Sequence, residues 1–259
     1  LTFSRAHGHH DFEKLLPKLY YRDPERIACN VGLKTDGRIR AIVGVFPLDW
    51  KVGESMLRIA GVSGVSCHPD HTGNGYMTAL MKHCVRQIQT EKYPLSYLSG
   101  QRQRYQNFGY ENCGTTAVLS MTRQNFKRAE KRERTFRFET IGEGDAERLE
   151  LIKNLCENQH TACVYPAEQY RRILHSYNQH PYAVVDESGQ DTGCLIAIPE
   201  DEDITEIVAA STDLEVAITR QWVESRDKAV SISIPSSRSE LIRALGKFSE
   251  RYELRRSGN

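Results

Sequence analysis

Two glycines in the stretch from His68 to Met77 could help the chain to hold an anion. Gly73 and Gly75 lie between an apolar run, which predicts a strand, and a helical pattern that begins near Met77. The first-turn N–H groups of a helix have no partners within the helix, and they lie at the positive end of its dipole. A phosphate group is favoured at such a junction. Glycine also leaves no side chain there to hold the phosphate away.

A second polar segment follows about one helix and one short strand later. It contains Gly100 and Gln101 and then the run Tyr-Gln-Asn-Phe-Gly-Tyr, which begins at Tyr105. A phenol has a reference pKa of about 10, so Tyr105 would stay protonated at neutral pH and could serve as an acid. The alternative is that Tyr105 packs a corner of the sheet.

Taken together, the segments HPDHTGNGYM and RYQNFGY resemble the GNAT superfamily of N-acetyltransferases, whose pattern is HPxxRGxGxG followed by FYxxxGF. The bulky residue that ends the loop, the YxxFGY segment and a second GNAT-like half make the chain most similar to the enhanced intracellular survival (Eis) group. The resemblance implies an acyltransferase enzyme with acetyl-CoA as co-substrate. It implies transfer of the acetyl group to a primary amine by direct attack in a ternary complex.

The resemblance also implies a role for each residue of the two segments. The loop would bind the pyrophosphate of acetyl-CoA, the preceding strand would pair its backbone with the pantetheine arm, and the next strand would end at the same cleft. Tyr105 matches the tyrosine that protonates the departing CoA thiolate, a proton transfer that contributes roughly 10²–10⁴-fold. The implied cofactor-binding residues are Gly73, Asn74, Gly75, Tyr76, Met77 and Thr78 in the loop, Val65, Ser66 and Cys67 in the strand, and Gly100 and Gln101 at the end of the next strand.

Two positions depart from the superfamily pattern. Thr72 stands where Arg or Gln is usual, so a charged contact to phosphate is missing, and Met77 stands where Gly or Ala is usual. We expect both residues to change the affinity for the cofactor rather than the class of enzyme. The sequence assigns no general base: Glu54 lies at the wrong end of the predicted strand, and His68 and His71 are expected to be surface loop residues. In Eis-like enzymes this role is attributed to the C-terminal carboxylate.

Composition excludes several classes of partner. The 259 residues include 35 basic and 34 acidic side chains, so no net field attracts nucleic acid or an anionic membrane. No apolar stretch approaches the roughly 20 residues of a membrane span, and no signal-peptide pattern opens the chain. We therefore expect a cytoplasmic protein with no membrane or nucleic-acid partner.

The cysteines and histidines do not predict a metal site. The seven cysteines are odd in number and contain no C-x-x-C pair, which argues against both a disulfide framework and zinc. His7, His9 and His10 precede any ordered pattern, so a terminal segment is favoured over a metal site there. We expect no metal cofactor.

The pattern of elements predicts an α/β (α+β) fold of tandem GNAT-like domains, each a mixed, mostly antiparallel central sheet flanked by helices. The catalytic domain is predicted at 1–125, with its first strand and helix missing or reduced. It contains a helical segment at 12–19, strands at 27–33 and 39–52 joined by an Asp36-Gly37 turn, and an amphipathic helix from Met77 to Ile88. Phe46, Trp50 and Tyr20 are candidates for the acceptor wall, or ordinary core.

A charged linker at 126–135 is predicted to lead to a second domain at 136–259 with the same order of elements. Where its glycine loop should fall, the chain has no glycine and carries Asp213 and Glu215, which would repel pyrophosphate. Ser211 to Asp213 instead indicates a helix N-cap. We therefore predict a degenerate, non-catalytic GNAT-like domain.

Several alternatives stay open. The chain could be a non-catalytic acyl-CoA-binding or scaffold module that keeps the GNAT fold. The acceptor could be a small-molecule or a peptide amine, and the sequence does not identify it. The oligomeric state is open, a homo-oligomer included. Eis-like proteins continue into a sterol-carrier-like C-terminal domain, which this sequence does not show.

Overall fold

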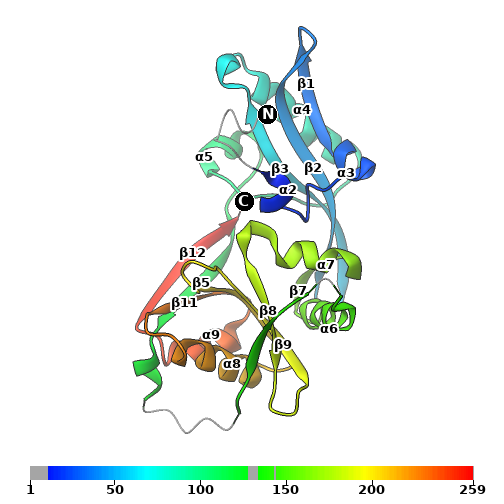
Figure 1. Ribbon diagram of the computed structural model, residues 1–259. Coiled ribbons are helices and arrows are strands. Elements are labelled where there is room, and N and C mark those ends of the chain that lie inside the picture. Colours follow the sequence, from blue (N-terminus) through cyan, green and yellow to red (C-terminus); the bar gives the residue numbers. More distant parts are fainter. Residues whose placement is uncertain (1–10, 128–133, 143, 259) are drawn as a thin grey trace. The chain divides into compact units, whose positions relative to one another are not determined.

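The computed structural model of the chain describes residues 11–127, 134–142 and 144–258, which form two compact units (Figure 1). Unit 1 contains the described residues up to Cys113, the segment Thr161–Tyr165 and the last residues from Ser257. Unit 2 contains Gly114–His160 and Pro166–Arg256. The predicted linker falls largely on residues 128–133, which lie outside the described residues, as does the histidine cluster near the N-terminus.

A five-stranded sheet forms the centre of unit 1. Its strands follow the order β1-β2-β3-β4, with β7 beside β2, and only the β3–β4 pair is parallel. The elements are α2 (Phe12–Leu15), α3 (Pro24–Ala28), β1 (Asn30–Thr35), β2 (Arg38–Val52), β3 (Ser55–Cys67), the 3-10 helix η1 (Pro69–His71), α4 (Tyr76–Thr90), β4 (Ser96–Leu98), α5 (Arg102–Tyr105), η2 (Gln106–Phe108) and β7 (Thr161–Val164).

The β1–β2 hairpin turns where the sequence predicts it. Thr35 pairs with Arg38, and both intervening residues, Asp36 and Gly37, have positive φ angles of 51° and 75°. A two-residue turn with two positive φ angles matches the right-handed twist of paired strands. The turn therefore sets the register as far as the Lys34–Ile39 pair, after which a bulge at Arg40 shifts it by one residue, so that Leu33 pairs with Ala41.

Helix α4 packs its predicted apolar stripe on one face of this sheet. Four residues of the stripe are buried, and Met77 and Val85 are partly buried against the same core. Ala41 and Val43 of β2 and Val62 of β3 lie on this side of the sheet. The four buried helix residues are Leu80, Met81, Cys84 and Ile88. Packing of α4 thus holds the loop before it against the end of β3.

The strand predicted at 27–33 begins later than expected. Residues up to Ala28 form α3, because Asp23 accepts hydrogen bonds from the backbone N–H groups of Glu25 and Arg26 and Pro24 occupies the first turn. An Asp-Pro start of this kind is a strong helix signal. Cys29, expected in a strand, follows the helix as its C-cap.

Unit 2 is built on a seven-stranded sheet with the order β12-β5-β11-β10-β9-β8-β6. Its β10–β11 pair is parallel, and the four neighbouring pairs from β5 to β11 and from β10 to β6 are antiparallel. The elements are β5 (Cys113–Met121), η3 (Arg123–Phe126), β6 (Arg137–Thr140), α6 (Ala146–Glu157), α7 (Ala167–Leu174), η4 (Ser176–Asn178), β8 (His180–Val185), β9 (Asp191–Ala197), β10 (Ile204–Ala209), α8 (Thr212–Glu224), β11 (Val230–Pro235), α9 (Ser239–Gly246) and β12 (Arg251–Gly258).

The predicted fold class is confirmed, since both sheets are mixed, mostly antiparallel and flanked by helices. The compact units, however, divide the chain at other points than 125 and 136. Strand β5 pairs with β11 in the sheet of unit 2, and β7 pairs with β2 in the sheet of unit 1. Pairing rather than sequence position decides where these two strands belong. Among the described residues, no helix is long and apolar enough to cross a membrane.

Candidate functional site

The parallel strands β3 and β4 separate before β3 ends. They pair from Ala60 with Ser96 to Val62 with Leu98, and β3 then continues to Cys67. Val65, Ser66 and Cys67, the strand residues implied to bind pantetheine, lie in this continuation. On the side of β4, no described strand residue pairs with them. Their backbone is therefore positioned to pair with an extended ligand between the two strands.

The loop after β3 presents a helix N-terminus without a cap. Gly75 is the N-cap of α4, with φ 73°, and no described side chain caps this helix or adds an acid to its first turn. Gly73 has φ 90°, and a Cβ atom at either glycine would enter open space. Left-handed backbone favours glycine at both positions. The same glycines leave room in front of the helix, as a phosphate cradle requires.

The remaining loop residues lie in the first turn of α4. The first backbone N–H of α4 to donate a helical hydrogen bond is that of Ala79, which reaches the Gly75 carbonyl oxygen at 2.9 Å. The N–H groups of the turn before Ala79 are therefore available to a ligand. Met77 packs toward the core, and its bulk is therefore directed away from the loop. The Tyr76 ring stacks on His71, with ring centroids 6.1 Å apart, while Asn74 and Thr78 are exposed.

Tyr105 lies against Gly100, two residues after the end of β4. A Cβ atom at Gly100 would come within 2.5 Å of the Tyr105 ring, so only glycine allows this packing. Tyr105 is 9% exposed, and burial raises the pKa of its phenol above the usual value, although nearby Arg104 acts in the opposite direction. Among the described residues, none forms a hydrogen bond with its hydroxyl group. Gln101 follows as the N-cap of α5.

The two histidines of the loop differ in exposure, since the side chain of His68 is buried and that of His71 is only partly buried. His68 is 8% exposed, and its Nδ1 accepts a hydrogen bond from the Asp70 backbone N–H at 3.3 Å. The prediction that His68 is a surface residue is therefore wrong, because its buried side chain caps the 3-10 helix η1. Glu54 lies in the β2–β3 turn, at the far end of β3 from the loop, as predicted.

A bulge in β3, not visible in the sequence, brings Tyr20 to the site. Ser63 pairs with Gly44 and Ser66 with Ile42, so β3 has one extra residue between these pairs. Gly64, in the bulge, has φ 63°, and a Cβ atom there would lie 2.3 Å from the Tyr20 hydroxyl oxygen. The Tyr20 hydroxyl also donates to the Ser63 Oγ at 3.5 Å. The run Gly-Val-Ser-Gly-Val-Ser is typical of an ordinary strand, so the sequence pattern does not predict the contact between Tyr20 and the bulge.

Tyr20 is held by an aromatic cluster. Its ring lies 4.8 Å from the Phe12 ring and 5.7 Å from the Phe46 ring, centroid to centroid. Phe46 is fully buried. Trp50, the third expected wall residue, instead lies near the other end of β2, paired with Leu57 and Cys163.

The corresponding place in unit 2 is filled by side chains of the chain itself. Helix α8 is capped by Ser211, as predicted, and has Asp213 and Glu215 in its first turn. Glu215 is 2% exposed, accepts a hydrogen bond from the Ala209 N–H at 3.2 Å and pairs with Arg238. Arg238 also donates to the Ile207 carbonyl oxygen at 2.8 Å. These contacts satisfy the backbone of β10 beside its parallel neighbour β11.

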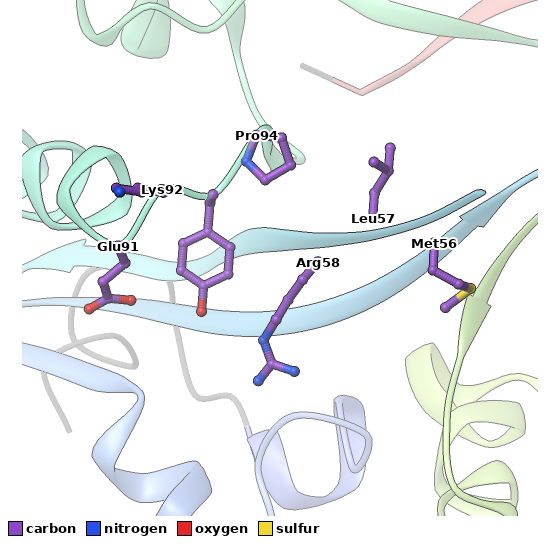
Figure 2. Close-up of a pocket in the computed structure, with 7 residues that line it drawn as sticks. Met56, Leu57, Arg58, Glu91, Lys92 and Pro94 are labelled. Atoms are coloured by element: carbon purple, nitrogen blue, oxygen red, sulfur yellow. The ribbon is translucent and has the colours of Figure 1, made fainter.

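A surface hollow lies elsewhere in unit 1 (Figure 2). It has a volume of about 360 Å³ and is formed at the start of β3 and in the connection from α4 to β4. None of the predicted site residues lines it. Its lining residues are Met56, Leu57, Arg58, Glu91, Lys92, Tyr93 and Pro94. Among the described residues, no group of histidine, cysteine or acidic side chains is placed to hold a metal ion.

Parallel strands that separate beside a glycine-led helix N-terminus are the arrangement that the resemblance to the GNAT N-acetyltransferases predicts. Residues 4–113 match the model of the family described as Acetyltransferase (GNAT) domain. This match confirms the resemblance and the enzyme class that the two motifs predicted, and it makes an acyl-CoA the class of co-substrate. No curated protein matches the chain in sequence.

Solved structures share the fold over nearly the whole chain. A conserved Enterococcus faecalis protein described as a probable N-acyltransferase is similar with TM-score 0.77 and 14% identity, over 99% of this chain and 67% of its own. Eis1 from Mycobacterium abscessus is similar with TM-score 0.68 and 16% identity, over 99% and 68%. A GCN5-related N-acetyltransferase from Kribbella flavida has TM-score 0.64 and 20% identity, over 89% and 59%. The Eis-like fold is therefore confirmed, and the chain spans 59% to 68% of these proteins' lengths.

Proposed function

We propose that the protein transfers an acetyl group from acetyl-CoA to a primary amine, by direct attack of the amine while both substrates are bound. The observation that carries this proposal is the uncapped N-terminus of α4 beside the unpaired end of β3. An extended ligand that ends in a pyrophosphate matches this arrangement, because it needs backbone partners along its length and an anion site at one end.

The binding roles follow from the geometry. The N–H groups of Gly73 and of the turn from Gly75 to Thr78 would hold the pyrophosphate without a side-chain cation, since Thr72 supplies none. Asn74 would contribute through its exposed side chain, because its N–H already donates to the His71 carbonyl oxygen at 3.4 Å. The backbone from Val65 to Cys67 would pair with the pantetheine arm. Holding both reactants in place supplies most of the acceleration in such a reaction. Gly100 and Gln101 would close the other side at the end of β4.

Tyr105 is proposed as the acid that protonates the departing thiolate. Its burial keeps the phenol protonated well above neutral pH, and its hydroxyl is not engaged with described residues. Its ring is fixed by Gly100 on one side and by Tyr110, whose centroid is 6.4 Å away, on another. The Tyr110 hydroxyl lies 2.7 Å from the Ser96 Oγ, which anchors this corner to β4.

Calorimetric titration with acetyl-CoA tests the binding half of the proposal. We expect one molecule bound per chain, and absence of binding would refute it. A thiol-release assay over a panel of small-molecule and peptide amines then tests transfer. The number of sites also tests unit 2, which we propose to be a degenerate, non-catalytic GNAT-like domain, because Glu215 and Arg238 occupy its strand separation. A second bound acetyl-CoA, seen at 209–217 in a crystal soak, would contradict that.

A non-catalytic acyl-CoA-binding module is the second candidate. It is favoured by the packing of Tyr105 within the hydrophobic core of unit 1. The two candidates differ in one measurement: a binding module retains acetyl-CoA in the titration, yet releases no thiol with any amine of the panel.

A further inference from the structure

A chain of two hydroxyl groups connects the Tyr105 segment, residues 102–111, to strand β3. The Ser96 Oγ donates a hydrogen bond to the Ala60 carbonyl oxygen at 2.9 Å, and it lies 2.7 Å from the Tyr110 hydroxyl oxygen. A carbonyl oxygen only accepts, and a serine hydroxyl has a single proton, so the Ser96 proton is committed to Ala60. Tyr110 is therefore the donor to Ser96, and the chain runs from Tyr110 through Ser96 to Ala60.

The hydroxyl chain lies on the face of the unit 1 sheet that α4 covers. Ala60 is the cross-strand partner of Ser96, and both Ala60 and Tyr110 belong to the hydrophobic core that contains the buried stripe of α4. Tyr110 is 6% exposed. A hydrogen bond in such low-dielectric surroundings is stronger than one in water. The chain is therefore an internal connection rather than a surface contact.

Tyr110 in turn holds Tyr105 by two contacts. Its backbone N–H donates to the Tyr105 carbonyl oxygen at 3.4 Å, and the two rings meet edge to face, with planes at 74°. Between them Gly109 ends the 3-10 helix η2 with φ 91° and turns the chain back. The position of the Tyr105 ring thus depends on that of Tyr110.

An exposed ion pair closes the Tyr105 segment from outside. The Nε and Nη2 of Arg102 donate to the two carboxylate oxygens of Glu111 at 2.6 and 2.7 Å. Both side chains are exposed, so water and salt screen the pair. This pair joins two residues of the segment to each other, whereas the hydroxyl chain joins the segment to the sheet.

We propose that Tyr110 and Ser96 are positioning residues that set the place of the Tyr105 hydroxyl relative to β3. The inference rests on the proposed function, in which the β3 backbone from Val65 to Cys67 pairs with the pantetheine arm. One strand then places both reacting groups, the thioester through its backbone and the acid through the hydroxyl chain. Strand β4 has only three residues and pairs with β3 at three positions, so its ladder alone gives the corner little support. A displacement of about 1 Å can cost about 10²-fold in rate, so this connection bears on catalysis.

Tyr110→Phe tests the proposal because it removes only the hydroxyl group. With the amine that the wild type acetylates fastest in the panel, we expect kcat to fall about tenfold, while the acetyl-CoA affinity from calorimetric titration stays unchanged. Tyr170→Phe is the matched control, since Tyr170 on α7 is also buried and donates a hydrogen bond to Glu157 at 3.4 Å. It should lower the melting temperature comparably and leave kcat unchanged. A kcat of Tyr110→Phe equal to that of the control would overturn the proposal.

A second background separates positioning from any independent role of Tyr110. In Tyr105→Phe the acid is already lost, so a further Tyr110→Phe should leave the residual kcat unchanged. An equal fall in both backgrounds would show that Tyr110 does not act through Tyr105, and the proposal would fail.

Ser96 supplies the conservative rescue. Ser96→Ala should lower kcat about as much as Tyr110→Phe, the two changes together should lower it no further, and Ser96→Thr, which keeps the hydroxyl group, should retain wild-type kcat. Full activity of Ser96→Ala would contradict the role of the chain. A wild type that releases no thiol with any amine would refute the transferase function and the positioning with it. Activity that depends on Tyr105 but not on Tyr110 or Ser96 would refute the positioning alone.

Discussion

Two pairs of strands are parallel in the described part of the chain, and in each pair a helix follows the first strand. The two helices differ in what lies at their start. After β3, helix α4 begins at Gly75 without a described cap or first-turn acid. After β10, helix α8 begins with the Ser211 cap and contains Glu215, which binds the Ala209 N–H and Arg238. The space between the parallel strands and the helix start is thus occupied by side chains in unit 2, whereas in unit 1 the helix start has no described cap.

The difference shows how a fold can keep its shape while losing a ligand. Where strands separate, backbone N–H and carbonyl groups lose their ladder partners and must be satisfied in another way. In unit 2 a carboxylate and a guanidinium supply the missing partners permanently. In unit 1 the partners are expected from a bound molecule. The variants that follow test this contrast, from the largest expected effect to the smallest.

Glu215→Ala should be the most damaging change. It leaves the partly buried Arg238 without its partner and the Ala209 N–H unsatisfied, and breaking a buried pair costs about 3–5 kcal/mol. The free energy of unfolding, measured with denaturant, should fall by that order. A double variant, Glu215→Leu with Arg238→Met, removes both charges and should regain only part of the loss, because the Ala209 N–H and the Ile207 carbonyl oxygen still lose their partners. A single variant as stable as the wild type would show that the pair does not hold β10.

Tyr105→Phe should lower kcat by about 100-fold, which is the lower end of the effect of losing a general acid. Phenylalanine keeps the ring against Gly100, so acetyl-CoA binding should be unchanged. Turnover of a confirmed amine substrate, measured by thiol release, checks this. Unchanged kcat would show that Tyr105 serves only to pack the corner after β4.

Gly75→Val should weaken acetyl-CoA binding by about tenfold, because a β-branched side chain intrudes on the cradle and resists the positive φ angle. Calorimetric titration gives the affinity. The matched change at the other helix is Ser211→Ala, which should cost about 1 kcal/mol of stability and leave acetyl-CoA binding unaltered. If Ser211→Ala affected the affinity as much as Gly75→Val, the two helix starts would not differ in function.

The pH profile should show the smallest effect. Tyr105 acts in its protonated form, and burial raises its pKa above the reference value of about 10. Activity supported by Tyr105 is therefore retained up to that pKa and lost only above it. Between pH 7 and 9, kcat/KM should rise as the amine acceptor loses its proton. A fall over that interval would point to another acid.

The sequence predicted the parts of the site that local patterns encode. The Asp36-Gly37 turn, the apolar stripe from Leu80 to Ile88 and the Ser211 cap depend on neighbours within a few residues, and the structure confirms them. The apolar content of 27–33 suggested a strand, yet the Asp23 cap gave a helix up to Ala28, since a cap and a first-turn proline outweigh weak strand propensity.

Features that depend on distant partners could not be predicted. The bulge at Gly64 is set by register with β2 and accommodates Tyr20, which is far away in sequence. Likewise, the residues 209–215 do not predict the ion pair between Glu215 and Arg238. The absence of glycine from this run did correctly indicate that the start of α8 differs from the start of α4.

The exchange of strands β5 and β7 between the halves of the sequence has a consequence for inheritance. Neither unit is continuous, because unit 1 ends its first segment at Cys113 and resumes at Thr161–Tyr165. A fragment cut near residue 125 would carry β5 without β11 and would deprive β2 of β7. A single recombination event cannot duplicate or replace one half without leaving a strand unpaired. We therefore expect the two units to be inherited together, as one gene segment.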